Sequence, residues 1–131
     1  MKYLLDTTWV VEYLRGNQEV IARIQELQEE GLAVSIVSVA ELYEGVFRSN
    51  NPSGNETALK DLLTAVTILD LTPDICKVYG EEKAKLLQKG TVIGALDLLI
   101  AATALNHDLV LLTADRDYER VEDLRVTFHA R

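Results

Sequence analysis

Short apolar runs alternate with longer amphipathic stretches along the chain. The apolar runs are nearly free of polar residues, which predicts strands that are covered on both faces. The predicted strands are 3–5, 32–35, 66–69, 109–112 and a short last strand from Val126. Segments with apolar residues three and four positions apart lie between them, as expected for helices. The predicted helices are 9–14, 18–30, 38–48, 57–63, 73–89 and 97–105.

Residues that favour helix ends support several of these boundaries. Asn17 precedes the second predicted helix as a cap, and Gly31 follows that helix. Pro73 begins the fifth helix, where its missing N–H costs nothing. Residues 50–55, Asn-Asn-Pro-Ser-Gly-Asn, are predicted as a loop. The sequence holds no repeat and no Pro- or Gly-rich linker, so we expect one domain over 1–131.

The alternation of buried strands with helices is typical of α/β proteins with a mainly parallel sheet. Helices cover both faces of such a sheet, which gives three layers. Ligands bind beyond the carboxyl ends of the strands, at the point where the strand order reverses. Polar residues that follow the predicted strands are therefore the candidates for chemistry.

Composition and charge narrow the classes of function. The chain of 131 residues is 48% hydrophobic, which suits one domain with its own core. Its 13 Lys and Arg against 21 Asp and Glu give a net charge of −8. That charge argues against binding of nucleic acid or membranes through a basic surface, although a bound cation can still attract a phosphate. The single cysteine, Cys76, excludes an internal disulfide, and no Cys/His cluster is present for zinc.

The sequence carries no membrane signal. No apolar run approaches the roughly 20 residues of a membrane span. The chain passes from Met1 and Lys2 directly into a predicted core strand, which differs from a signal peptide. We therefore expect a cytoplasmic protein without a membrane partner.

Four carboxylates stand among apolar neighbours. Asp6 follows the first predicted strand, and Asp115 follows the fourth. Glu41 lies in the helix after the second strand, and Asp97 begins a later helix. Because parallel strands end at one edge of the sheet, we expect these side chains to converge there. Clustered carboxylates repel one another unless a cation neutralises them, and ligands that are all oxygen favour Mg²⁺ or Mn²⁺.

Each carboxylate also has a purely structural alternative. Asp6 and Asp97 are both placed where they could cap a helix, because Asp is a favoured N-cap residue. Glu41 could extend its long side chain out of an apolar face, and Asp115 could cap a turn at 116–119. The shared position of all four at one sheet edge favours the metal site.

The segments around these residues resemble PIN-domain proteins of the VapC type, the ribonuclease toxins of toxin–antitoxin pairs. The matching segments are Leu-Leu-Asp-Thr-Thr-Trp-Val-Val-Glu-Tyr-Leu-Arg-Gly at 4–16, Ser-Val-Ala-Glu-Leu-Tyr-Glu-Gly at 38–45, Ile-Gly-Ala-Leu-Asp-Leu-Leu-Ile-Ala-Ala-Thr-Ala at 93–104 and Leu-Val-Leu-Leu-Thr-Ala-Asp-Arg-Asp-Tyr at 109–118. Together they span nearly the whole chain. The resemblance implies a three-layer α/β fold with a short-stranded, mainly parallel central sheet flanked by helices.

The resemblance also implies roles for individual residues. The acidic residues that would hold Mg²⁺ or Mn²⁺ are Asp6, Glu41, Asp97 and Asp115. Thr7 and Thr113 match small hydroxyl positions that steady this site. Asp117 is a fifth carboxylate nearby, and we predict that Asp115 and not Asp117 faces the metal. Asp117 lies where the first turn of a short helix favours an acidic side chain by itself.

The implied activity is metal-dependent hydrolysis of RNA phosphodiester bonds by an endoribonuclease. Metal held by carboxylates can activate a water and stabilise the leaving oxygen, which agrees with the residues present. The implied partners are the RNA substrate, a small antitoxin protein and a second copy of the chain. Six apolar residues are predicted to form surplus surface for such partners: Val10, Val11, Leu14, Leu42, Val46 and Phe47.

Two other functions fit parts of the pattern. A PIN-like module that binds RNA or protein without catalysis would keep the fold, but the four intact carboxylates argue against it. A phospho-receiver signalling domain is also an acidic α/β domain of similar length. That domain needs an acidic pair near its first strand and a lysine after a late strand. Asp6 stands alone, and 113–115 contains no lysine.

Overall fold

Five parallel strands form the central sheet of the computed structural model, which describes residues 1–128. The strands are β1 Tyr3–Leu5, β2 Leu32–Ser35, β3 Thr67–Leu69, β4 Val110–Thr113 and β5 Val126–Phe128. Their order is β3-β2-β1-β4-β5. The chain moves outward from β1 through β2 and β3, then returns to pair β4 with the other side of β1. The strand order therefore reverses beside β1, where α/β proteins bind ligands.

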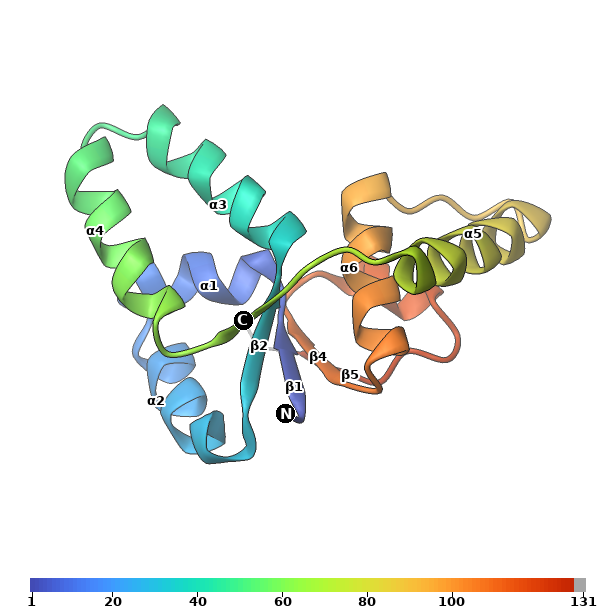
Figure 1. The fold of residues 1–131 in the computed structure, drawn as a ribbon, viewed down its shortest axis with the longest axis horizontal. Helices are drawn as coiled ribbons and strands as arrows, with labels where there is room; N and C mark the ends of the chain where they lie inside the picture. The colour runs from blue at the N-terminus through green and yellow to red at the C-terminus, as the bar shows by residue number, and fades with distance from the viewer. Residues whose placement is uncertain (129–131) are drawn as a thin grey trace.

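Helices cover both faces of this sheet. The helices in the described part of the chain are α1 Thr7–Leu14, α2 Gln18–Leu27, α3 Ile36–Arg48, α4 Pro52–Leu63, α5 Pro73–Gln88 and α6 Ala95–Asn106, with short 3-10 helices η1 Gln28–Glu30 and η2 Arg116–Arg120. Figure 1 shows α1 to α4 on one side of the sheet and α5 and α6 on the other. This confirms the prediction of a short-stranded parallel sheet between helical layers.

The strand order also differs from the 2-1-3-4-5 order of phospho-receiver domains, which excludes that alternative.

Two apolar clusters form the core, and β1 contributes to both. Leu4 belongs to the cluster that includes α5 and α6, whereas Leu5 belongs to the one that includes α1 to α4. Neighbouring residues of a strand point to opposite faces, so β1 separates the two clusters. Trp9 fills the second cluster, and the apolar α6 is buried in the first through residues such as Ile100 and Ala101.

The predicted loop at 50–55 is wrong, because α4 begins at Pro52. The Asn51 side chain accepts the backbone N–H of Gly54 at 3.1 Å and so caps this helix. Pro52 occupies the first turn, where its missing N–H would have no partner within the helix. The same Asn, Pro and Ser residues that favour a loop therefore form a helix start.

Three helices begin two residues earlier than predicted. They start at Thr7, Ile36 and Ala95. The start of α3 was missed because its first residues are apolar and look like the continuation of β2. The hydroxyl of Ser35 accepts the N–H of Val37 at 3.0 Å and marks the true start. The predicted second helix ends in the 3-10 turn η1, and strand ends shift by at most one residue.

The predicted surplus of apolar surface is mostly wrong. Val10, Leu42 and Val46 are buried in the core cluster of α1 to α4. Val11 and Leu14 are partly buried against the same cluster. Only the sixth residue, Phe47, is largely exposed, at 65%. The helical spacing of these residues therefore marks faces that pack against each other within the domain.

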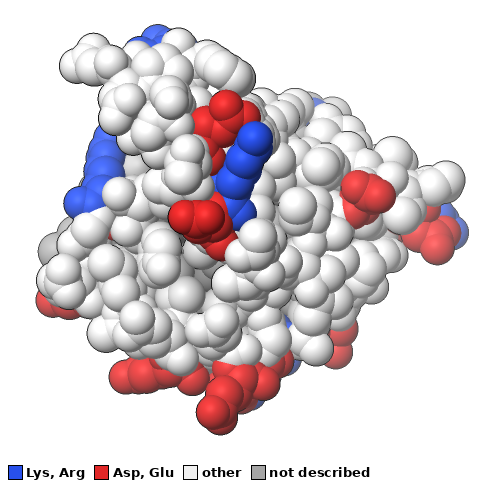
Figure 2. Space-filling view, turned by 60° about the vertical axis from the view of Figure 1, so that its left-hand side comes forward, with Lys and Arg blue, Asp and Glu red and all other residues white. Residues whose placement is uncertain are grey.

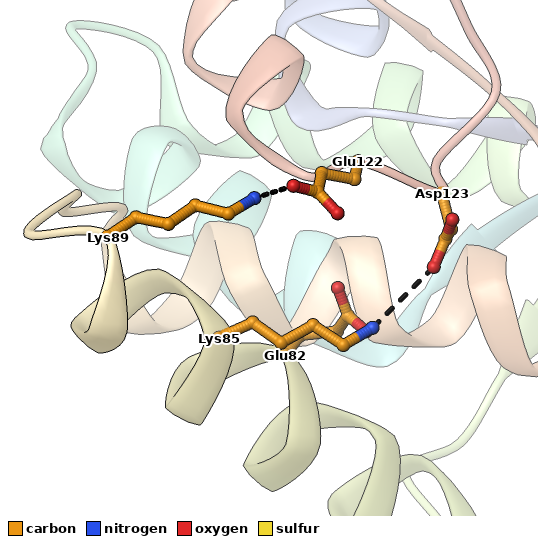
Figure 3. A network of polar contacts seen from close by, with 5 residues as sticks. All are labelled: Glu82, Lys85, Lys89, Glu122 and Asp123. Atoms are coloured by element: carbon orange, nitrogen blue, oxygen red, sulfur yellow. Dashed lines mark hydrogen bonds and ion pairs between the residues drawn. The ribbon is translucent and has the colours of Figure 1, made fainter.

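An ion-pair network ties α5 to the segment that follows η2 (Figure 3). Lys85 lies 2.9 Å from Glu82 and 3.5 Å from Asp123. Lys89 pairs with Glu122. These contacts fix the chain just beyond η2 and pair Lys85 of α5 and Lys89, directly after α5, with acidic residues. None of the helices within residues 1–128 is long and apolar enough to cross a membrane.

Candidate active site

The four predicted carboxylates lie at the carboxyl edge of the sheet. Asp6 directly follows β1, and its backbone N–H donates to the carbonyl oxygen of Leu112 in β4 at 2.9 Å. Asp115 lies two residues beyond β4. Glu41 is in the second turn of α3, and Asp97 is in the first turn of α6. The ends of β1 and β4 and the N-terminal turns of α3 and α6 thus bring the four residues to one region.

Asp6 is a buried carboxylate held by hydroxyl groups. Its side chain belongs to a residue that is only 2% exposed. Thr113 donates to Oδ2 at 2.6 Å and Thr8 donates to the same oxygen at 2.9 Å, while Tyr118 donates to Oδ1 at 3.0 Å. Asp6 occupies the N-cap position of α1, yet its carboxylate forms no capping hydrogen bond. The capping alternative therefore does not explain this carboxylate, whose recorded partners are all neutral.

Two adjacent threonines at the start of α1 serve different carboxylates. The Thr7 hydroxyl donates to Glu41 Oε1 at 2.7 Å and lies 3.0 Å from the Ser38 hydroxyl. Thr8 donates to Asp6 and accepts the N–H of Ala114 at 3.0 Å. Of these two threonines, only Thr7 was predicted from the sequence to belong to the site. Their different roles follow from the helix, which turns neighbouring side chains in different directions.

The end of β4 connects Asp115 to Asp6. The buried Thr113 hydroxyl donates to Asp6 and accepts the N–H of Asp115 at 3.0 Å. Oδ1 of Asp115 accepts the N–H of Asp117 at 2.9 Å, so Asp115 does cap η2, as its structural alternative proposed. Asp117 instead pairs with Arg120 at 3.3 Å through a side chain that is 48% exposed. Asp115 is therefore connected to Asp6 through the Thr113 hydroxyl, whereas Asp117 turns towards Arg120 at the surface.

Asp97 lies close enough to the other three carboxylates for their negative charges to act on it. Its pKa is raised to about 6, first by burial and then by the charges of Asp6, Asp115 and Glu41. The Tyr118 hydroxyl, 3.3 Å from Asp97 Oδ1, acts in the opposite direction. Gly94 and not Asp97 is the N-cap of α6. Asp97 is therefore not a helix cap, and its surroundings carry excess negative charge.

The arrangement fits a hard cation in its chemistry but does not form a complete cage. Among residues 1–128, no three or more His, Cys, Asp or Glu side chains are placed so that they could hold a metal ion together. In this arrangement several carboxylate oxygens accept hydrogen bonds instead. Mg²⁺ commonly keeps several waters and uses only one or two protein carboxylates, so it does not require such a cage. Three acidic neighbours help to raise the pKa of Asp97, which is consistent with a site where positive charge is favoured.

The surface beside Glu41 is hollowed and carries little free positive charge. Thr7, Glu44, Gly45 and Arg48 line this hollow with Glu41. Arg48 pairs with Glu44 at 3.2 Å. On the face drawn in Figure 2, the basic side chains of the described residues stand apart from one another, with acidic side chains next to the central one. A phosphate approaching this face therefore meets no continuous basic patch.

Comparisons with known proteins place these observations in a family. The family model for the PIN domain matches residues 3–124. Ribonuclease VapC2 of Haemophilus influenzae is 36% identical over 95% of this chain and 96% of its own length. The tRNA(fMet)-specific endonuclease VapC of Salmonella typhimurium is 27% identical, with 96% of each chain covered.

Solved structures give the same result. VapBC2 from Rickettsia felis, bound to a DNA fragment from its promoter, matches with a TM-score of 0.94 at 28% identity, over 99% of this chain and 100% of that one. VapBC-1 from nontypeable Haemophilus influenzae matches with a TM-score of 0.87 at 32% identity, over 98% of both chains. The matched chains therefore share the five-stranded fold almost from end to end.

Proposed function

The chain belongs to the PIN-domain family, as a member of its VapC type, and on that basis we propose that it is a metal-dependent endoribonuclease and the toxin of a toxin–antitoxin pair. The observation that carries the proposal is the set of four carboxylates at the strand-order reversal, with the pKa of Asp97 raised by its acidic neighbours. A charge excess of this kind favours a divalent cation. The substrate is RNA, in line with the relatives named as ribonucleases.

The side chains of this site divide into ligands and groups that orient them. Asp6, Glu41, Asp97 and Asp115 would hold Mg²⁺ or Mn²⁺. Such an ion supplies an activated water and stabilisation of the leaving oxygen, which is the chemistry of phosphodiester hydrolysis. Thr8 and Thr113 orient the Asp6 carboxylate, and Thr7 orients Glu41. These fixed hydroxyls limit the rotation of the carboxylates and keep their oxygens directed at the edge of the sheet.

Asp115→Ala should reduce RNA cleavage far more than Asp117→Ala. Asp115 interacts electrostatically with Asp97, whereas Asp117 pairs with Arg120 on the surface. Loss of a group that only supports the site through a water typically costs about 10- to 100-fold, and excess metal can restore part of it. Both variants are assayed on single-stranded RNA across a Mn²⁺ titration. We expect high Mn²⁺ to restore part of the cleavage activity in Asp117→Ala only. A larger loss of cleavage in Asp117→Ala than in Asp115→Ala would place the site two residues later.

We also propose that the chain binds a small antitoxin protein and forms a homodimer. Support for the antitoxin comes from the matched structures, which are VapBC complexes. Exposed apolar side chains offer surface for protein partners. They include Phe47, Leu87, Val92 and Leu96.

Expression of this chain alone in a bacterial host should stop growth, because RNA cleavage by an uninhibited toxin removes transcripts or stable RNA. The measurement is the growth curve after induction, with the Asp97→Asn variant as the matched control at equal protein level. Co-expression of the antitoxin that binds this chain should restore growth. Unimpaired growth with active, folded enzyme present would contradict the toxin role and leave the nuclease activity standing.

A further inference from the structure

Tyr118 connects three separate parts of the chain at the acidic site. It lies in η2, three residues after Asp115. Its ring is fully buried in the apolar cluster that includes α5 and α6. Its hydroxyl reaches the end of β1 at Asp6 Oδ1, 3.0 Å away, and the first turn of α6 at Asp97 Oδ1, 3.3 Å away. One phenol group thus touches two of the four carboxylates.

The hydrogen-bond partners of Asp6 make this contact specific. Thr8 and Thr113 both donate to Oδ2, so within residues 1–128 Tyr118 is the recorded side-chain donor to Oδ1. Within the described residues, the recorded hydrogen-bond donor to the Asp97 carboxylate is the Tyr118 hydroxyl. A phenol carries a single proton, and both of its neighbours here are acceptors. The hydroxyl therefore shares its one proton between Asp6 Oδ1 at 3.0 Å and Asp97 Oδ1 at 3.3 Å, and so keeps these two oxygens close together.

Packing alone does not require this hydroxyl. A phenylalanine would fill the same space in the apolar cluster and would bury no polar atom. A buried hydroxyl is tolerated where it has partners, and here both partners belong to the acidic set. The contact therefore concerns the arrangement of the carboxylates more than the filling of the core.

We propose that Tyr118 is a positioning residue that aligns Asp6 and Asp97 for a divalent cation through its shared hydroxyl. The proposal rests on the proposed function, because it assumes that these two carboxylates bind metal. Groups that orient metal ligands through hydrogen bonds typically contribute about 10- to 100-fold to metal affinity. Tyr118 acts through Asp6 and Asp97 and does not need to contact the RNA.

The test is the affinity of Tyr118→Phe for Mn²⁺, measured by titration calorimetry on the metal-free full chain without RNA. We expect an affinity about 10- to 100-fold lower than that of the parent. Cleavage by the variant should recover when Mn²⁺ is raised by the same factor, so that the rate at saturating metal stays close to the parental rate. Since phenylalanine keeps the ring, the variant should fold, and circular dichroism checks this.

Tyr79→Phe is the matched control. Tyr79 packs against the same apolar cluster from α5, and no hydrogen bond from its hydroxyl to the carboxylates is recorded in the described structure. This variant should bind Mn²⁺ as the parent does. If the parent binds Mn²⁺ and Tyr118→Phe binds it equally well, Tyr118 only packs, and the proposal is overturned while the proposed function stands. If the parent itself binds no Mn²⁺, the metal-dependent function fails, and this proposal fails with it.

Discussion

Replacing Asp97 with asparagine is expected to raise the melting temperature of the metal-free protein at pH 7.5 and to abolish RNA cleavage. The pKa of Asp97 is about 6 in the folded state against 3.8 for an ordinary Asp, because burial and three acidic neighbours disfavour its charge. At pH 7.5 the charged form therefore destabilises the fold. Asparagine has a similar shape and carries no charge. Since Asp97 is only half-buried, solvent reduces the gain to about 1 kcal/mol, or about 4 °C.

The pH dependence gives this prediction a definite sign. Below pH 3.8 the Asp97 carboxyl is protonated in both folded and unfolded states, so it imposes no penalty. Between pH 3.8 and about 6 it becomes charged in the unfolded state first, and the penalty on folding grows. Above pH 6 the penalty is complete. The stability advantage of Asp97→Asn should therefore be present at pH 7.5 and vanish towards pH 4, as measured by calorimetric melting.

The Asp97→Asn variant should also lose the stability and the activity that a bound metal ion gives the parent. In the parent, Mn²⁺ at 100 times its dissociation constant should stabilise the fold by about 2.7 kcal/mol. In Asp97→Asn this stabilisation should be largely absent, and cleavage should fall by more than the about 100-fold typical of an indirect partner. Asp117→Asn removes one charge from a surface ion pair and serves as the control. A fall in the metal-free stability of Asp97→Asn would instead contradict charge repulsion at Asp97, because asparagine differs from aspartate here mainly in its charge.

Removing divalent cations is expected to reduce RNA cleavage by at least about 1000-fold, beyond the effect of losing a single stabilising donor. The net charge of −8 and the clustered carboxylates repel the phosphate backbone. Basic residues near the site offer little compensation, because Arg48 and Arg120 both pair with acidic neighbours. Without a cation, the site therefore lacks a positive charge for the scissile phosphate.

EDTA in excess should stop cleavage of single-stranded RNA, and added Mg²⁺ or Mn²⁺ should restore it. The measurement is the initial rate on a labelled RNA before chelation, during chelation and after the cation is returned. Melting curves at each step show whether the protein stays folded while inactive. Full activity in EDTA would show that cleavage does not use a metal.

The fold was largely predictable because its signals are local. Each strand is an apolar run of three or four residues, and caps such as Asn17 mark helix starts directly. The start of α4 was missed because Asn and Pro are favoured in loops as well as at helix starts. The contact from Gly54 N–H to the Asn51 side chain shows that the helix begins at Pro52.

The positions of the carboxylates were predictable, and the family resemblance named Thr7 and Thr113, but the roles of Thr8 and Tyr118 were not predicted. Asp6 and Asp115 follow buried strands, and that position alone places them at the carboxyl edge of a parallel sheet. Thr8 lies only two positions from Asp6, but Tyr118 contacts Asp6 from 112 positions away. No pattern within a short window reports the Tyr118 contact. In its local sequence, Tyr118 cannot be distinguished from a tyrosine that only packs in the core.

The central claim is that cleavage depends on a cation held by these four carboxylates. The most direct measurement compares Mn²⁺ occupancy, from titration calorimetry, with the rate of RNA cleavage at the same Mn²⁺ concentrations. The parental rate should rise in proportion to Mn²⁺ occupancy, and Asp97→Asn should show neither binding nor cleavage in that range. Cleavage at the full rate before the site fills with Mn²⁺ would contradict the central claim.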